Sequence, residues 1–272
     1  MGLEEPDRLK DYNPRSTYTR LGASLPIQRG DYVLIDYVAK VKETGEVIDL
    51  TREDVAKATK FYREDGIYEP QLVIVGEGWV LKGLDEALTT MEVGEEKVVE
   101  IPPEKAFGER DPGKVRIVPA RELTRRGIAP RIGARVEIDG RLGVIRSVGG
   151  GRVTVDFNHP LAGHSIIYEV KVVSKVEGDL EKAVELLHRR MRRVPKDRFK
   201  VKLEGGVLEI ELPEEAFTLE DLQYAKRGFA LDVERYLPQV SVVRFYETYV
   251  VRGEGASSPE PGQGQGPSGS EA

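Results

Sequence analysis

The segment that most constrains the fold is residues 75–108, which read VGEGWVLKGLDEALTTMEVGEEKVVEIPPEKAFG. Its apolar residues recur at spacings of three and four, which places one set on a single face of a short helix: Leu81, Leu84, Leu88 and Met91. Gly94 breaks this helix, and the β-branched run 97–101 predicts a strand that two prolines end. The segment holds no cysteine or histidine and no serine beside a base, so it predicts an apolar groove and not covalent catalysis.

The composition narrows the class of protein. A chain of 272 residues is long enough for about two domains, or three small ones. The absence of cysteine excludes disulfides, thiol catalysis and cysteine-based zinc sites. A net charge of −6 provides no general attraction to nucleic acid or to an anionic membrane. No apolar run approaches the roughly 20 residues that span a bilayer, and residues 1–15 lack the apolar core of a signal peptide. We therefore expect a soluble cytoplasmic protein without membrane contact.

The first part of the chain predicts strands around one helix. Residues 32–41 alternate as a half-buried strand does, residues 47–50 resume the extended form after a turn, and residues 71–75 form a further strand. Residues 51–62 predict a helix, with Thr51 as its N-cap and Asp54 completing a capping box. We expect this helix to lie over or beside the groove.

The middle of the chain predicts a small β-rich module of about 45 residues. Extended segments are expected at 114–118, 134–138, 142–148 and 152–157, with a helical turn near 121–125. Asp139-Gly140 is a strong hairpin signal. Residues 166–173 then predict another strand.

The last part predicts an α-β-β-α-β unit. Asp179 is the expected cap of a helix whose apolar face is Leu180, Val184, Leu187 and Met191. A hairpin is expected at 199–203 and 207–212, and residues 218–221 predict a capping box for a second helix, followed by a strand at 242–251. The apolar stripe of that second helix is Leu222, Ala225, Phe229 and Val233. From Gly253 onward the composition predicts disorder.

Several motifs occur in the order found in one enzyme family. The runs V-G-E-G-x-V-L-x-G-L-x-E-A-L, M-x-V-G-E and I-P-P-E-K-A-F-G closely resemble the FKBP-type peptidyl-prolyl isomerases. The run N-H-P-L-A-G at 158–163 is similar to the SlyD-like branch of that family, especially its longer archaeal members. The resemblance covers roughly residues 28–177.

The resemblance implies an α+β fold with an FKBP-like antiparallel β-sheet wrapped on a short helix. It also implies that the β-rich module is an insertion (an insert-in-flap domain), where the residues alone suggest two neighbouring β-rich units. The expected divisions are an N-terminal arm at 1–27, a discontinuous isomerase domain at 28–109 and 157–177, an inserted chaperone domain at 110–156, a C-terminal α-β-β-α-β domain at 178–252, and a disordered tail at 253–272.

The resemblance also implies the residues of a substrate pocket. The expected catalytic residues are Tyr37, Asp49, Leu81, Phe107 and Tyr168. The expected substrate contacts are Ile48, Val80 and Leu84. Phe107 stands where tyrosine is common in the family, Tyr168 where phenylalanine is usual, and Leu84 where many relatives have tryptophan. The pattern alone favours Tyr37, Leu84 and Tyr168 as core residues of a β-rich domain over residues of a groove.

The function implied by the resemblance is X–Pro isomerisation with chaperone activity, without cofactor or metal. Rotation about the X–Pro bond has a barrier near ~20 kcal/mol, and an apolar cradle favours the less polar twisted amide. The expected partners are unfolded or proline-containing polypeptides. The candidate capture surface of the insert comprises Val115, Ile117, Ile128, Ile132, Val136 and Leu142. His159, His164 and His188 have no metal-ligand spacing.

An alternative from another class is a non-catalytic holdase, or a ribosome- or RNA-associated binding protein, on the same scaffold. It is favoured by Phe107, which has no hydroxyl, and by the arginine-rich run 188–193. The strand rhythm of residues 136–155 is also similar to small RNA-associated β-barrels. The sequence leaves open the oligomeric state, the clients, and the roles of the arm and of the C-terminal domain.

Overall fold

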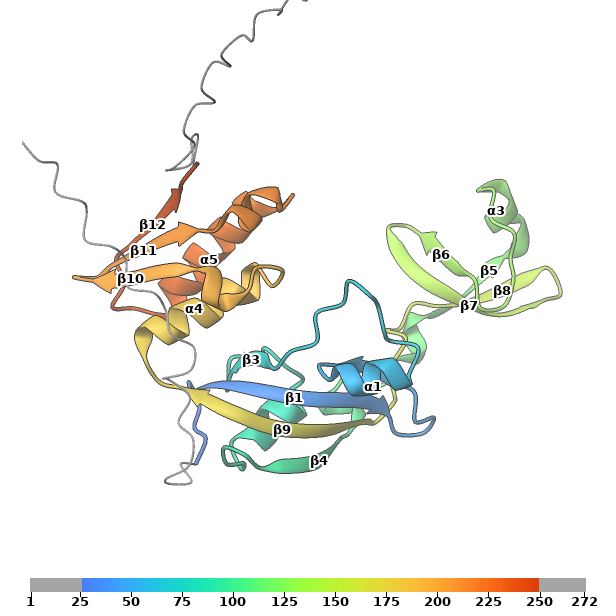
Figure 1. Cartoon of the computed structure of the whole chain (residues 1–272). Helices are drawn as coiled ribbons and strands as arrows, with labels where there is room; N and C mark the ends of the chain where they lie inside the picture. The colour runs from blue at the N-terminus through green and yellow to red at the C-terminus, as the bar shows by residue number, and fades with distance from the viewer. Residues whose placement is uncertain (1–25, 250–272) are drawn as a thin grey trace, which may run out of the picture.

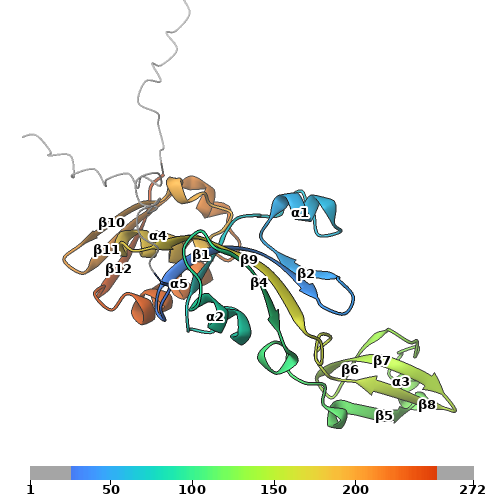
Figure 2. The same ribbon diagram turned by 90° about the horizontal axis from the view of Figure 1, so that it is seen from below.

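The structure, a computed structural model, describes residues 26–249. It comprises three β-sheets, each with helices of its own (Figure 1). The sheet nearest the N-terminus lies in the middle, the insert lies at one end of it, and the C-terminal helices and strands lie at the other (Figure 2). The arm expected at 1–27 lies almost entirely, and the tail expected at 253–272 entirely, outside the described residues.

The central sheet is antiparallel throughout and has five strands in the order β2-β1-β9-β4, with β3 beside β1. Its strands are β1 (Tyr32–Val41), β2 (Val47–Leu50), β3 (Gln71–Ile74), β4 (Glu96–Ile101) and β9 (Ile166–Val176). Both β2 and β3 pair with the same edge of β1, one at each end. Helix α2 (Lys82–Leu88) packs on one face, as expected for a sheet wrapped on a short helix.

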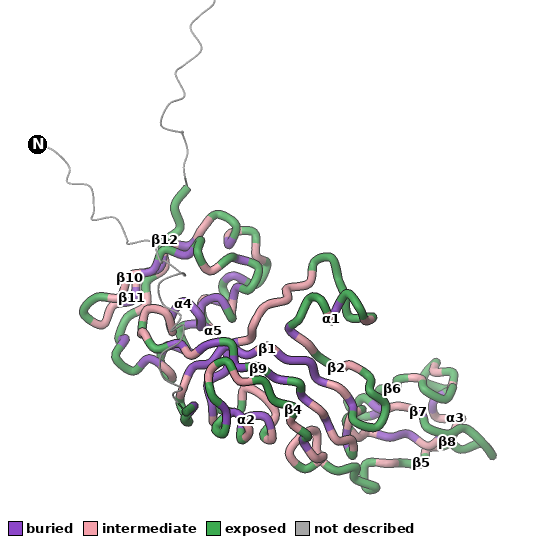
Figure 3. Tube along the Cα trace, turned by 60° about the horizontal axis from the view of Figure 1, so that its bottom comes forward, coloured by how far each residue is buried: buried purple, intermediate pink, exposed green. Residues whose placement is uncertain are grey.

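Strand β1 is buried on both faces along its first half, so the prediction of a half-buried strand is wrong there. Five of its residues pack in the core with α2: Val33, Ile35, Tyr37, Ala39 and Val41. Tyr32 and Leu34 point to the other face, where they pack with the C-terminal helices. Figure 3 shows this buried stretch running along β1. The C-terminal domain therefore covers the face that an isolated sheet would leave to water.

The insert has a four-stranded antiparallel sheet in the order β5-β8-β7-β6. Its elements are β5 (Val115–Pro119), α3 (Ala120–Arg125), β6 (Arg135–Ile138), β7 (Arg141–Gly149) and β8 (Arg152–Asp156). Asp139 and Gly140 both have positive φ and form the expected hairpin turn. The module has a separate small core, made of Leu123, Val136, Ile138, Ile145, Val153 and Val155.

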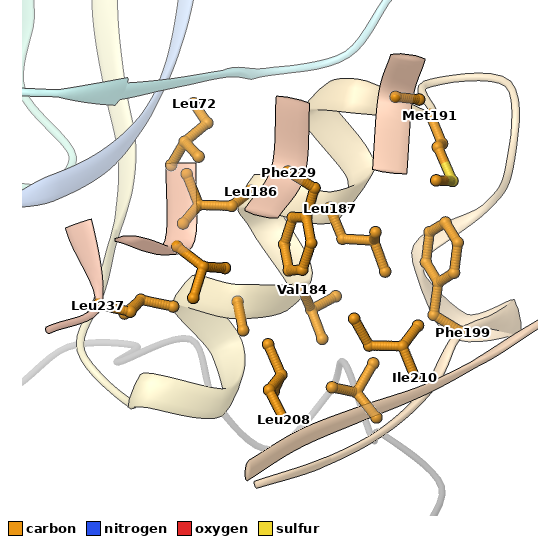
Figure 4. Packing of buried hydrophobic residues seen from close by; sticks show 14 of the residues in the cluster. Leu72, Val184, Leu186, Leu187, Met191, Phe199, Leu208, Ile210, Phe229 and Leu237 are labelled. Carbon is orange, nitrogen blue, oxygen red and sulfur yellow. The ribbon is translucent and has the colours of Figure 1, made fainter. Parts of the chain in front are cut away.

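The C-terminal elements follow the expected α-β-β-α-β order. They are α4 (Asp179–Arg190), β10 (Lys200–Glu204), β11 (Val207–Leu212), α5 (Leu222–Tyr236) and β12 (Val242–Glu247). Strands β10 and β11 form a hairpin, and β12 runs parallel to β11 after the α5 crossover. Figure 4 shows Val184 and Leu187 of α4 packing with Phe229 of α5 and with Leu208 and Ile210 of β11.

Short 3-10 helices connect several elements within residues 26–249. They are Pro103–Lys105, Pro112–Lys114, Lys196–Arg198 and Glu214–Thr218. In the same part of the chain, no helix has both the length and the apolar composition needed to cross a membrane.

The helix expected at 51–62 is much shorter, and its predicted cap is wrong. Helix α1 covers only Glu53–Ala58, and Arg52 is its N-cap without a side-chain bond. The Thr51 hydroxyl instead accepts a hydrogen bond from the Tyr37 amide at 2.9 Å and donates to Asp36 at 2.9 Å. Thr51 thus ties α1 to β1.

The two other predicted caps are also wrong. Asp179 lies inside α4, and Gly178 occupies the N-cap position. Asp221, not Thr218, precedes α5, and its side chain makes no capping bond. The Thr218 hydroxyl donates to the Glu215 carbonyl at the end of a 3-10 helix. In each case the chain turns later or earlier than the local pattern predicts.

Candidate functional site

The expected pocket residues come from distant parts of the chain and lie around one cavity of about 490 Å³. Seven of them line it: Tyr37, Ile48, Asp49, Val80, Leu81, Phe107 and Tyr168. They are carried by β1, β2, the loop before α2, the loop after β4, and β9. The volume is within the range of ordinary ligand sites.

Leu84 is the expected site residue that does not line this cavity. It is fully buried in the core beneath, on the face of α2 that packs on the sheet. The expected direct contact of Leu84 with substrate is therefore not met. Leu84 supports the cavity floor by packing only.

Local hydrogen bonds position the cavity walls. The carboxylate of Asp85, in the first turn of α2, accepts from the amides of Gly76 at 2.8 Å and Gly78 at 3.3 Å. This holds the loop that carries Val80 and Leu81. The backbone amides of those two residues donate to no acceptor within residues 26–249. They are free to bind a carbonyl oxygen.

A polar network crosses one wall of the cavity. The Tyr37 hydroxyl lies 2.8 Å from the Asp49 carboxylate and 2.8 Å from the side-chain amide of Gln71. Both partner atoms, the carboxylate oxygen and Oε1 of Gln71, are acceptors, and a hydroxyl has one hydrogen; the carboxylate is the stronger acceptor, so Tyr37 donates to Asp49, with Gln71 as its alternative acceptor. Burial first, and the Asp49 charge second, raise the pKa of Tyr37 above its ordinary value. The Tyr37 hydroxyl therefore stays protonated and holds Asp49 at the rim.

The opposite wall is aromatic. The Tyr168 ring lies 5.4 Å from that of Tyr37, and Phe107 stacks on His159 with centroids 4.6 Å apart. The Tyr168 hydroxyl donates to no acceptor among the described residues. Burial first, and Asp49 second, raise the pKa of Tyr168 to about 12. Tyr168 thus presents a neutral, unused hydroxyl to the cavity.

Four further residues line the cavity that sequence reasoning missed: Gln71, Gly78, Trp79 and Leu161. Trp79 had a usable signal, because it is the single tryptophan of the chain and sits between glycine and the expected Val80. Nothing in the sequence marks Gln71 as a cleft residue, because a polar residue at the start of an apolar strand is common at strand ends. Its role depends on its hydrogen bond to Tyr37.

The arginine-rich run 188–193, in the last turn of α4 and just after it, is largely paired inside the molecule. His188 lies 2.9 Å from Glu69, Arg192 also reaches Glu69, and Arg190 makes two bonds of 2.6 Å to Asp232. These pairs leave few charges for phosphates, so they weigh against the RNA-associated alternative. Within residues 26–249, no three His, Cys, Asp or Glu side chains are grouped to hold a metal ion.

Of the six residues in the predicted capture surface, three are exposed, two are half-buried and one is buried. Ile117, Ile132 and Leu142 are 66%, 71% and 73% exposed. Val115 and Ile128 are half-buried. Val136 points into the small core, so its assignment to the capture surface is wrong.

Three family models match the chain. The model described as FKBP-type peptidyl-prolyl cis-trans isomerase matches residues 24–124, that of FKBP26, IF domain, matches 116–161, and that of FKBP26_C-terminal matches 179–250. The first of these describes the class to which the central sheet and its cleft correspond. The other two match the regions of the insert and of the C-terminal domain.

Curated relatives match about half of this chain and nearly all of their own. A short-type peptidyl-prolyl cis-trans isomerase of Methanocaldococcus jannaschii is 42% identical over 146 residues, 54% of this chain and 92% of the relative. An FKBP-type 16 kDa peptidyl-prolyl cis-trans isomerase of Escherichia coli is 34% identical, covering 54% and 92%. The isomerase SlyD of Treponema pallidum is 32% identical, covering 58% and 82%. The chain therefore belongs to the FKBP-type peptidyl-prolyl cis-trans isomerase family, as the motifs predicted.

Proposed function

We propose that this cavity, the proline cleft, catalyses cis-trans isomerisation of X–Pro bonds in unfolded or nascent polypeptides. The observation that carries the proposal is convergence: seven residues expected from separate motifs line one cavity. The cleft contains no cysteine or serine nucleophile among its lining residues. Catalysis must then come from the environment that the walls provide.

The walls can lower the barrier without a covalent step. As the X–Pro amide twists it loses resonance and polarity, so it is favoured by the apolar side chains of Ile48, Val80 and Phe107. The substrate carbonyl needs a donor as it rotates, and the free Leu81 amide and Tyr168 hydroxyl offer one. Lowering the barrier by ~7 kcal/mol corresponds to about five decades in rate. Several modest contacts supply such a sum.

The proposal is tested by a protease-free isomerisation assay on a proline tetrapeptide. Asp49→Ala and Tyr37→Ala break the network at the cleft wall, and we expect each to lower kcat/KM at least tenfold. The matched control is Asp197→Ala, an exposed aspartate in the C-terminal domain. Equal activity in all four proteins would mean that this cavity is not the active site.

We also propose that residues 110–156 form a chaperone domain that holds client chains beside the proline cleft. Its exposed Ile117, Ile132 and Leu142 offer apolar contacts, and tethering raises the local substrate concentration, to about the millimolar range for a short link. Replacing residues 110–156 by a short bridge should spare turnover of the tetrapeptide and strongly slow proline-limited refolding of a protein.

A second variant avoids deletion of a folded unit. Ile132→Ser with Leu142→Ser removes two exposed side chains and leaves the small core intact. We expect it to reproduce the refolding defect in part, with tetrapeptide turnover unchanged. Equal loss in both assays would contradict this division of labour.

The alternative is a non-catalytic holdase on the same scaffold. Its structural support is Phe107, whose ring stacks on His159 and offers no hydroxyl. The holdase predicts no turnover of the tetrapeptide by the unmodified protein and normal suppression of client aggregation. The isomerisation assay described above separates the two functions.

A further inference from the structure

A second cavity lies at the junction between the central sheet and the C-terminal domain. It has a volume of about 460 Å³ and is lined on one side by Glu69, Gln71 and their neighbours. On the other side it is lined by residues of α4 and α5, among them His188, Arg189 and Tyr224. We call this cavity the interdomain cleft. In Figure 1, α4 lies close to β3, whose residues Gln71 and Leu72 line the interdomain cleft.

The interdomain cleft adjoins the proline cleft through two residues. Gln71 lines both cavities and bonds to the Tyr37 hydroxyl. Trp79 lines the proline cleft, and its ring lies 4.0 Å from the guanidinium of Arg189, which lines the interdomain cleft. The Trp79 indole also donates to the Tyr236 hydroxyl at 3.0 Å, which fixes the junction. Gln71 therefore lies where the two cavities meet.

Most charges of the interdomain cleft are paired, and within residues 26–249 the exceptions are Arg189 and Asp221. Glu185 binds Lys196 at 2.7 Å, and Arg190 binds Asp232. Glu69 binds both His188 and Arg192. Arg189 makes no ion pair with a carboxylate within residues 26–249; its guanidinium lies over the Trp79 ring, and Arg190, Asp232 and Tyr236 are close enough to act on its charge.

The position of Arg189 favours an anionic ligand. Burial first, and the adjacent Arg190 second, lower the pKa of the Arg189 guanidinium. A carboxylate placed there would relieve both penalties with a charge-assisted hydrogen bond. Asp221 is the acidic residue of this cleft without an ion pair among the described residues, and it is the N-cap of α5. Tyr236 lies at the other end of this 15-residue helix, about 22 Å from Asp221 along the helix axis.

We propose that a substrate polypeptide runs from the proline cleft past Gln71 and Trp79 into the interdomain cleft, where Arg189 binds a carboxylate of the chain. This inference rests on the proposed isomerase function. It assigns the C-terminal domain a part in substrate selection, namely a preference for aspartate or glutamate within a few residues of the proline. An extended chain advances about 3.3 Å per residue, so the preferred offset reports the path.

The test uses paired peptides that contain one proline and a single Glu or Gln at one to five residues on either side. For the full chain we expect the Glu peptide to be preferred at one offset, on one side of proline only. The expected ratio of kcat/KM is roughly three- to tenfold, the range of an ion pair partly withdrawn from water. Added salt should reduce this ratio.

Substitutions then assign the preference. Arg189→Gln should bring the Glu-to-Gln ratio to about one, and Arg189→Lys should retain part of it. The matched control is Arg193→Gln, which removes an exposed arginine whose one ion pair within residues 26–249 spans 3.9 Å, and it should keep the full ratio. A ratio within about twofold at every offset, a preference for the Gln peptide, or a ratio that survives Arg189→Gln would overturn the inference.

Binding separates this inference from the isomerase proposal. Fluorescence anisotropy of the same labelled peptides gives the Glu-to-Gln ratio of Kd without any turnover. If no peptide is isomerised but Glu peptides bind more tightly and Arg189→Gln abolishes the difference, the isomerase proposal fails and the subsite stands. If peptides are isomerised with no such difference in affinity or rate, the subsite fails and the isomerase proposal stands.

Discussion

At the scale of single residues, the cleft differs from the resembled family at two aromatic positions, with Phe107 where tyrosine is common and Tyr168 where phenylalanine is usual. Phe107 has no hydroxyl and stacks on His159, whereas Tyr168 carries a hydroxyl without a partner in the described part of the chain. Both side chains line the same cavity. We infer that Tyr168 supplies the hydroxyl donor that Phe107 lacks.

This pair of differences predicts the effect of moving the hydroxyl between the two positions. Tyr168→Phe removes the unused donor and should lower kcat/KM about fivefold, the value of one hydrogen bond near ~1 kcal/mol. Phe107→Tyr in that background should restore part of the loss, as measured in the tetrapeptide assay. An unchanged rate in Tyr168→Phe would show that the hydroxyl faces the cleft without acting on the substrate.

Tyr168 also predicts a loss of stability at alkaline pH. Its pKa is raised from 10.0 to about 12 by burial, so the folded protein keeps the phenol neutral after the unfolded chain has ionised it. The stability from this group is complete below pH 10 and is lost as pH rises toward 12, by about 1 kcal/mol at pH 11.

Urea unfolding at pH 9 and pH 11 measures this loss. The Tyr168→Phe variant lacks the phenol and should lose about 1 kcal/mol less than the unmodified protein between the two pH values. A surface control is Tyr224→Phe, because Tyr224 is exposed on α5 and should change nothing. Equal losses in the protein and in Tyr168→Phe would contradict the assigned cause.

Residue patterns in the sequence predicted most of the residues that line the cleft, but not the hydrogen bonds that hold Tyr37 in place. Motif order placed Tyr37, Asp49 and Phe107 correctly around the cavity. Gln71 and the Thr51 hydroxyl were missed or misassigned, because their roles are hydrogen bonds to Tyr37, made across 34 and 14 residues of sequence. A cap prediction reads only the nearest turn, and a tertiary partner took the Thr51 hydroxyl instead.

At the scale of elements, the position of α2 on the sheet depends on a glycine. A Cβ at Gly83 would lie 2.5 Å from Cγ2 of Ile101 on β4, which is closer than real Cβ contacts. Helix α2 can therefore approach β4 only because Gly83 has no side chain. The helix in turn carries Asp85, which holds the loop of the cleft.

Gly83→Ala tests which of two opposed effects is larger. Alanine gains about 1 kcal/mol of helix propensity, whereas overpacking against a fully buried isoleucine costs about 1–3 kcal/mol. We expect net destabilisation of roughly 1 kcal/mol in urea unfolding, with reduced tetrapeptide turnover. Glu86→Ala, at an exposed site of the same helix, should stay within about 0.5 kcal/mol. A stabilised Gly83→Ala would show that propensity outweighs packing.

Strands were the elements that the sequence predicted most reliably, but the burial of β1 shows what such patterns cannot predict. The strand at 32–41 was placed correctly, because alternation and β-branched residues are local properties. Its second buried face was not foreseen, because Tyr32 and Leu34 acquire their cover from α4 and α5, more than 140 residues later in the chain. Helix ends were less reliable, and α2 begins after Leu81 and ends before Met91.

At the scale of the whole molecule, the insert and the C-terminal domain are attached differently. The insert core shares no residue with the other two cores. The C-terminal core instead includes Leu72 and Ile74 of the central sheet. The C-terminal domain should therefore unfold together with the central sheet, while the insert opens by itself.

Asp156 at the base of the insert makes this testable. Its buried carboxylate accepts from Arg110 at 2.6 Å and from Asn158 at 2.8 and 3.0 Å. Burial raises the pKa of Asp156, but the bonds from Asn158 and Arg110 outweigh it and lower the pKa below its ordinary value. This stability is present above about pH 4 and is lost as pH falls through the folded pKa.

Asp156→Ala should destabilise the insert by about 2–3 kcal/mol, because several donors lose their acceptor. Hydrogen exchange at neutral pH should show faster exchange in β5 to β8 and unchanged exchange in β1 and β9. The exposed Glu137→Ala in the same module should leave both unchanged. Faster exchange throughout the molecule would contradict independent opening of the insert.

The amino-acid sequence alone indicated the strands and the order of the C-terminal elements, because alternation and turn chemistry are encoded within short segments. The order of its motifs indicated seven of the residues that line the cleft. It could not determine the second buried face of β1, the partners of the arginines at the end of α4, or the place of Gln71 in the lining of both clefts. These features depend on which surfaces distant segments remove from water together. Which surfaces become buried together follows from long-range packing and desolvation, and no single segment of the sequence contains that information.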